Sequence, residues 1–117
     1  MALYNFVKKV EELVGDKPLT FVGHSLGGGL ASLASILTGR PAIVFNPAAV
    51  AESYVTALEL MGKSHGTSNI YGYIMVWDYV TIGQACFGVL APGNFKIVKN
   101  MTGGDPHAIE TMVENLK

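Results

Sequence analysis

The sequence predicts an α/β fold in which a mostly parallel sheet of about four strands is flanked by helices. Short, continuous apolar runs alternate along the chain with longer segments whose apolar residues recur at helical spacing. Strands that alternate with helices are typical of parallel sheets with right-handed crossovers. Half of the 117 residues are apolar and only 15% are charged, which suits a sheet covered on both faces. The length predicts one domain over residues 1–117.

Four segments are predicted to be helical. Apolar residues recur at helical spacing over Leu3–Val14 and again over Val50–Met61. The segment at about 26–38 is dense in Gly, Ala and Ser, small residues that allow a helix to approach a sheet closely. The last helix is predicted to open at Asp105 as N-cap, with Pro106 in its first turn. Its predicted buried face consists of Ile109, Met112, Val113 and Leu116.

Four apolar runs are predicted to be strands. They cover about 19–23, Ala42–Phe45, Ile70–Trp77 and Phe95–Val98. Runs this short and this apolar indicate buried strands. Between the third and fourth strands the sequence predicts a long, mostly apolar loop over about 80–94.

The pentapeptide Gly23–Gly27 has the pattern G-x-S-x-G and lies between the first predicted strand and the second helix. That setting is typical of a nucleophile elbow, in which a serine sits on a sharp, strained turn. We expect Gly23 and Gly27 to come close together there, because neither has a Cβ. The pattern predicts Ser25 as a nucleophile and the backbone N–H of Leu26 as an oxyanion donor. The alternative is a glycine-rich turn that only lets a helix pack tightly on a sheet.

Asp78 and His107 follow Ser25 in the order of an α/β-hydrolase triad. Asp78 is the first polar residue after the third predicted strand, and His107 lies beyond the fourth. Both therefore fall at the carboxyl ends of strands, where catalytic residues of such sheets gather. The pattern predicts His107 as the base for Ser25 and Asp78 as the group that orients the imidazole. The alternatives are a solvated strand-end carboxylate and an exposed histidine in the first turn of a helix.

Three other polar residues fit these roles less well. Asp105 is explained as a helix cap before Pro106. His24 lies inside the elbow, and we expect its side chain to point away from the solvent side of the nucleophile. His65 lies in a polar loop ahead of Asp78, which breaks the expected order. The sequence has no zinc-type cluster and no phosphate-binding glycine loop, so neither a metal nor a cofactor is predicted.

Composition argues against several classes of partner. A net charge of −1 with no basic cluster argues against nucleic acid. The single cysteine, Cys86, excludes an intrachain disulfide. No signal-peptide pattern is seen and no apolar run is long enough to span a membrane. Localisation is left open, with the cytoplasm as the default expectation.

Four motifs of the chain resemble those of the class 3 lipase family of α/β-hydrolases. They are Thr20–Ala31, Val44–Pro47, Trp77–Val80 and Asp105–His107. The resemblance covers about residues 5–117. It implies hydrolysis of carboxylic esters, either acyl glycerides or phospholipids, without a metal or an organic cofactor. On this interpretation Phe87, Val89 and Leu90 of the long loop help to line an acyl pocket; core packing under the loop is the alternative.

The chain also departs from the pattern of that family. The family has several strands and a helix ahead of the elbow strand, whereas one predicted helix precedes it here. The resemblance therefore implies a truncated core without the upstream loop that carries the second oxyanion donor. We expect the elbow strand to have an open edge, where a second copy or a complementing partner could pair. Three functions stay open: an ester hydrolase, a binding or assembly module with an incomplete oxyanion hole, and acyl transfer to an acceptor other than water.

Overall fold

The structure is a computed structural model that describes residues 2–76, 78, 81, 84 and 91–117. Its helices and strands lie in the order α1 (Ala2–Val14), β1 (Phe21–His24), α2 (Leu26–Thr38), β2 (Ala42–Phe45), α3 (Glu52–Leu60), β3 (Ile70–Met75), β4 (Asn94–Val98) and α5 (Ile109–Leu116). Most boundaries agree with the predicted ones to within about two residues, the usual uncertainty of helix and strand ends. Trp77, predicted as the end of the third strand, lies outside the described residues.

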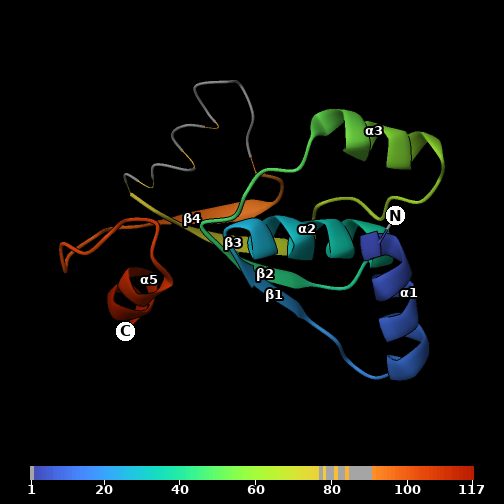
Figure 1. The fold of residues 1–117 in the computed structure, drawn as a ribbon, viewed down its shortest axis with the longest axis horizontal. Helices are drawn as coiled ribbons and strands as arrows, with labels where there is room; N and C mark the ends of the chain where they lie inside the picture. Colours follow the sequence, from blue (N-terminus) through green and yellow to red (C-terminus); the bar gives the residue numbers. More distant parts are fainter. Residues whose placement is uncertain (1, 77, 79–80, 82–83, 85–90) are drawn as a thin grey trace.

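The four strands form one sheet in the order β1-β2-β3-β4, and each neighbouring pair is parallel. Helices α2 and α3 lie on one face of the sheet, and α5 lies against the other face near the carboxyl ends of the strands (Figure 1). The predicted α/β fold with a four-stranded sheet flanked by helices is therefore confirmed. The sheet is entirely parallel among the described strands, where the sequence predicted it to be mostly so.

Helix α2 approaches the sheet closely because its first turn carries glycines. A Cβ on Gly28 would lie 2.8 Å from the Cβ of Pro47, and one on Gly29 would lie 2.9 Å from the carbonyl oxygen of Ala48. The buried Ser32 hydroxyl donates a 2.8 Å hydrogen bond to the Gly28 carbonyl, so its polarity is satisfied within the helix. The core on this face contains Ala31, Leu33, Ile36, Ala42, Val44, Leu58 and Ile70.

The opposite face is covered at one end only. Met112 of α5 is fully buried against Met75 and Val98. The predicted buried face of this helix is partly wrong, because Val113 and Leu116 are 49% and 43% exposed. Helix α5 packs on the carboxyl ends of β3 and β4, so only one stripe of the helix meets the sheet.

An uncovered row of apolar side chains crosses the rest of this face. Val22, Ile43 and Tyr71 occupy neighbouring positions in the register of β1, β2 and β3, and they are 64%, 37% and 51% exposed. The expectation of a sheet covered on both faces is therefore wrong within the part of the chain that the structure describes. Composition shows how many residues are apolar. It does not show whether another segment of the described residues packs over them.

The last helix begins at Ile109, with Ala108 as its N-cap, and not at Asp105. Residues 105–108 form a separate turn, in which the Asp105 carboxylate accepts the His107 N–H at 2.9 Å. The Asp105 carbonyl accepts the N–H of Ala108 at 3.1 Å. The prediction of Asp105 as a helix cap is thus wrong, because its side chain binds the backbone two residues on in a turn of the kind Asp favours.

Helix α1 is anchored to the fold by Val7, which is buried, and by Arg40. The Arg40 guanidinium donates to the Glu11 carboxylate at 2.8 Å and to the carbonyls of Lys17 and Gly15 at 2.8 Å and 2.7 Å. The hydrogen bond to Glu11 raises the pKa of Arg40 above its ordinary value. Arg40 therefore binds the end of α1 and the segment leading into β1 at once.

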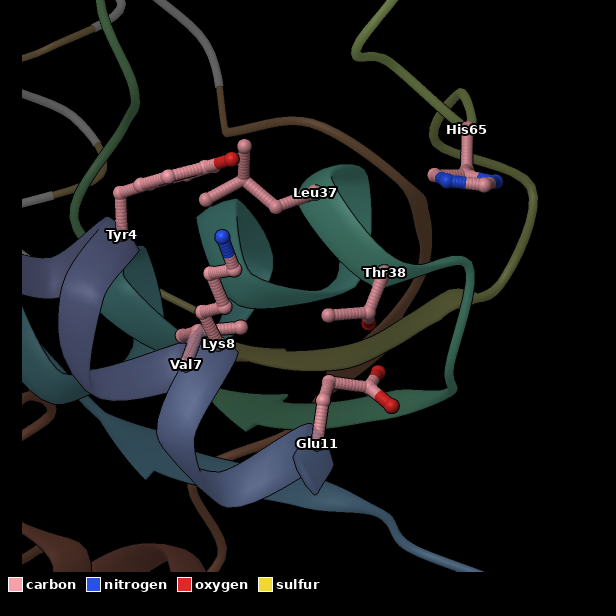
Figure 2. Close-up of a pocket in the computed structure, with 7 residues that line it drawn as sticks. All are labelled: Tyr4, Val7, Lys8, Glu11, Leu37, Thr38 and His65. Atoms are coloured by element: carbon pink, nitrogen blue, oxygen red, sulfur yellow. The ribbon is translucent and has the colours of Figure 1, made fainter. Parts of the chain in front are cut away.

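A hollow of about 350 Å³ lies between α1, the end of α2 and the segment that carries His65 (Figure 2). It is lined by Tyr4, Val7, Lys8, Glu11, Leu37, Thr38 and His65. Helix α2 runs back toward the amino ends of the strands, so this hollow lies at the opposite end of α2 from Ser25. No helix among the described residues is long and apolar enough to cross a membrane.

Gly28 and Gly27 provide a matched test of the close approach of α2. We expect Gly28→Ala to be less stable than Gly27→Ala by about 1–3 kcal/mol, the usual cost of overpacking. A Cβ at Gly27 meets nothing within 4 Å, so that variant isolates the general gain of Ala over Gly in a helix. Urea unfolding of both variants measures the difference; equal stabilities would contradict the packing described above.

Candidate active site

Ser25 alone makes the turn between β1 and α2. Its backbone has φ 55° and ψ −120°, a conformation that residues with a side chain rarely adopt and that costs of the order of 1–3 kcal/mol. Three backbone hydrogen bonds hold it: its N–H donates to Phe45 at 3.1 Å, and its carbonyl accepts the N–H groups of Gly29 at 3.1 Å and Ala48 at 2.8 Å. The elbow is therefore tied both to α2 and to the end of β2.

Of the two glycines predicted to be needed at the elbow, only Gly23 has a close neighbour. A Cβ on Gly23 would overlap the carbonyl of Gly27, whereas a Cβ on Gly27 would meet no atom within 4 Å. The expected close approach of Gly23 and Gly27 is therefore confirmed, but the lack of a Cβ is required only at Gly23. The close approach involves the backbone carbonyl of Gly27, whose own Cβ direction is open.

The structure brings Ser25, His107 and Asp78 together. The Ser25 hydroxyl oxygen lies 2.7 Å from Nε2 of His107, and Nδ1 of His107 lies 2.6 Å from Oδ1 of Asp78. A carboxylate can only accept, so Nδ1 of His107 carries a proton. In the neutral ring, Nε2 is then an acceptor for the serine O–H. The arrangement is one in which a hydroxyl proton can move to an imidazole that a carboxylate orients.

Asp78 is 1% exposed, so the alternative of a solvated strand-end carboxylate is wrong. Its Oδ2 accepts two hydrogen bonds from Thr81, one from the backbone N–H at 3.0 Å and one from the hydroxyl at 2.5 Å. Its Oδ1 faces His107. A buried carboxylate is tolerated only when donors satisfy it, and these three contacts do so.

His107 precedes α5 in the turn of residues 105–108, and its side chain is 13% exposed. The alternative of an exposed histidine in the first turn of a helix is therefore wrong. Its side chain reaches between Ser25 and Asp78.

His24 lies against His107, a contact that the expectation of a side chain pointing away from the solvent side of Ser25 did not include. Its Nε2 is 2.6 Å from the His107 carbonyl oxygen, and the two ring centroids are 5.1 Å apart. The reason is the alternation of side chains along β1: Gly23 faces α2, so His24 faces the opposite side, where the turn of His107 lies.

Sequence reasoning missed two residues that support the site, Thr81 and Asn46. Asn46 is fully buried in a left-handed conformation, with φ 43°. Its amide nitrogen donates to the Pro106 carbonyl at 3.0 Å, and its amide oxygen accepts the Met75 N–H at 2.8 Å. Two signals in the sequence could have identified them. Asn46 directly follows a buried strand, and Asn tolerates the left-handed conformation; Thr81 comes three residues after Asp78.

The remaining predicted residues are placed as follows. Leu26 is the first residue of α2, where backbone N–H groups have no partner inside the helix, and it adjoins Ser25. His65 lies in the segment before β3, beside Gly39 at the end of α2. The predicted acyl-pocket residues Phe87, Val89 and Leu90 lie outside the described residues. Within the described ranges, no group of three or more His, Cys, Asp or Glu side chains could hold a metal ion.

Two comparisons with known proteins bear on this site. The family model for the Tle-like phospholipase domain matches residues 4–117, which include Ser25, Asp78 and His107. The chain is also similar to a protein named extracellular phospholipase A1 from Serratia liquefaciens, with 47% identity over 81 residues. That alignment covers 66% of this chain and 25% of the relative, so this chain matches about a quarter of the relative's length.

Thr81 offers a test of how the buried carboxylate is stabilised. We expect Thr81→Val to lower the free energy of unfolding by about 1.5–3 kcal/mol, because an ionised acceptor loses its hydroxyl donor. Thr81→Ser keeps the hydroxyl and serves as the control, with a smaller loss. Chemical denaturation of both variants measures the effect. A Thr81→Val protein as stable as Thr81→Ser would contradict the role assigned to the hydroxyl.

Proposed function

We propose that this chain, which belongs to the family of Tle-like phospholipase domains, hydrolyses lipid esters with Ser25 as its nucleophile. Membership of the family supports lipid-ester hydrolysis in general. The Ser25–His107–Asp78 triad, the acyl-enzyme and a phospholipid substrate are the further content of the proposal. It rests above all on the two short hydrogen bonds that connect Ser25 to His107 and His107 to Asp78.

The first half-reaction transfers the acyl group to the enzyme. The Ser25 oxygen attacks the carbonyl carbon of the ester, and its proton passes to Nε2 of His107. The tetrahedral intermediate collapses as His107 returns the proton to the departing alkoxide of the substrate. The carbon–oxygen bond to the alcohol breaks, and an ester between the acyl group and Ser25 remains. Asp78 holds the proton-bearing Nδ1 and stabilises the imidazolium that forms between the two proton transfers.

The second half-reaction releases the acid. Water takes the place of the alcohol and gives a proton to His107 as its oxygen attacks the acyl carbon. The second tetrahedral intermediate collapses, and the proton returns to the Ser25 oxygen. The products are a free fatty acid and the unmodified enzyme. An alcohol that takes the place of this water gives acyl transfer, the third function left open by the sequence.

The oxyanion of each tetrahedral intermediate needs donors that are already in position. We propose the backbone N–H of Leu26 as one of them, because it adjoins Ser25 at the N-terminus of α2. The positive end of the helix dipole lies at the same place and favours the developing negative charge. A binding module with an inert serine is less well supported, because it gives no reason for a carboxylate-oriented imidazole beside the Ser25 hydroxyl.

A phospholipid is the substrate we propose. The relative from Serratia liquefaciens is named as a phospholipase A1, and the matching family is one of phospholipase domains. This chain matches only a quarter of that relative, so a phospholipid substrate is a proposal for this chain.

The open edge of β1 is part of the same proposal. In the described sheet β1 pairs only with β2, so its outer edge presents unpaired backbone groups next to the elbow. We propose that a second copy of the chain or a complementing partner pairs there. Sedimentation velocity tests the first possibility directly: a dimer supports it, and a monomer at high concentration leaves the complementing partner.

Labelling with a fluorophosphonate tests the nucleophile. We expect one adduct per chain, mapped to Ser25, that is lost in Ser25→Ala and strongly slowed in His107→Ala. We expect Asp78→Asn to lower the rate of fatty-acid release from phospholipid vesicles by about 10⁴-fold, the loss seen when an imidazole is held in the wrong tautomer. A folded protein that forms no adduct would refute the hydrolase and favour the binding module. Ester products in the presence of added alcohol would indicate acyl transfer.

A further inference from the structure

His24, the second residue of the pentapeptide, is joined to the residue proposed as the base. Its Nε2 lies 2.6 Å from the carbonyl oxygen of His107, a contact between residues 83 positions apart. A carbonyl oxygen can only accept, so Nε2 of His24 carries the proton of this hydrogen bond. The bond is partly buried and short, and no step of the reaction described above uses it.

The position of His24 makes this contact more than a surface hydrogen bond. Residues 24 and 25 are consecutive, and both bind His107: Ser25 contacts Nε2 of the ring and His24 binds the backbone carbonyl. The elbow therefore holds His107 at two points, one at each end of the residue. Because the elbow backbone is itself fixed by its hydrogen bonds to Phe45, Gly29 and Ala48, the two points have a set spacing.

The turn that carries His107 is held by hydrogen bonds within the turn and by side chains from other segments. Residues 105–108 belong to neither a strand nor a helix, so no ladder of backbone hydrogen bonds sets the place of His107. The carbonyl one residue earlier, that of Pro106, accepts the buried amide of Asn46. Two successive carbonyls of the turn are thus held by side chains from the carboxyl ends of β1 and β2.

We infer that His24 is a positioning residue, which holds the His107 imidazole in line between Ser25 and Asp78 by donating Nε2–H to the His107 carbonyl. The inference rests on the proposed function, because the hydrogen bond from His24 can position a base only if His107 acts as one. Reactions of this kind need the reacting groups within a narrow range of geometry, and a misplacement of about 1 Å can cost about 100-fold in rate.

A simpler role for His24 is packing, since its ring is tilted by 37° against the ring of His107. The two roles predict opposite orders of variants. Gln and Met have similar length and flexibility, but only Gln can donate a hydrogen bond from the position of Nε2. Phe keeps an aromatic ring and has no donor. Donation requires Gln to replace His24 better than Met or Phe, whereas packing requires Phe to replace it best.

The experiment measures the second-order rate of Ser25 phosphonylation in the full chain and in His24→Gln, His24→Met and His24→Phe. We expect Met and Phe to slow the reaction by about 10- to 100-fold and Gln to retain most of the rate. His65→Met is the control, because His65 is exposed at the far end of α2, and we expect it to leave the rate unchanged. Thermal unfolding of each variant checks that it is folded, and the Met and Phe variants substitute for each other if one is not.

Proton NMR of the same proteins gives a readout that does not depend on activity. The proton between Nδ1 of His107 and Asp78 is expected as a far-downfield signal in the wild type and in His24→Gln, and as a broadened or lost signal in His24→Met and His24→Phe. A wild type without phosphonylation would refute the proposed function, while the pattern of this signal would still decide the role of His24. An unchanged signal and rate in His24→Met, or Phe performing better than Gln, would overturn the inference.

Discussion

The backbone of Ser25 is the constraint on which the rest of the site depends. A residue with a side chain is held at φ 55°, and that conformation persists only because its surroundings determine it from several sides. Gly23 leaves room for the carbonyl of Gly27, and hydrogen bonds tie Ser25 to α2, to the end of β2 and to Ala48. The close packing of α2 over Pro47 and the exposure of the serine hydroxyl toward His107 are consequences of the same short turn.

A parallel sheet explains how residues far apart in the sequence meet at this turn. The carboxyl ends of all four strands lie at one edge, so the segments that follow them converge there. Ser25 follows β1, Asn46 follows β2, Asp78 comes three residues after β3, and His107 lies beyond β4. The segment after each strand thus contributes a different side-chain group: a hydroxyl, an amide, a carboxylate and an imidazole.

Two of these polar groups, the Asp78 carboxylate and the Asn46 amide, are buried, and burial of a polar group costs free energy unless hydrogen bonds satisfy it. A carboxylate that is 1% exposed is held by three donors, so every one of its contacts matters to both folding and orientation. Asn46 is fully buried and uses both ends of its amide, one on Pro106 and one on Met75. The site is thus supported by polar side chains that have no part in the proposed proton transfers. The elbow itself contributes one of them through His24.

Local sequence determined the elements and the identity of the central residues. The small residues after the pentapeptide predicted α2, and a continuous apolar run predicted β2, each at its observed bounds. The pentapeptide with the order Ser–Asp–His predicted three side chains that lie within hydrogen-bond distance. These signals are local or depend only on chain order. The tertiary structure decided what covers and what touches each residue: the uncovered row at Val22, the turn at Asp105, and the contacts of Thr81, Asn46 and His24. Such contacts depend on which face of a strand a side chain occupies and on which distant segment packs there. The spacing of residues along the chain determines neither.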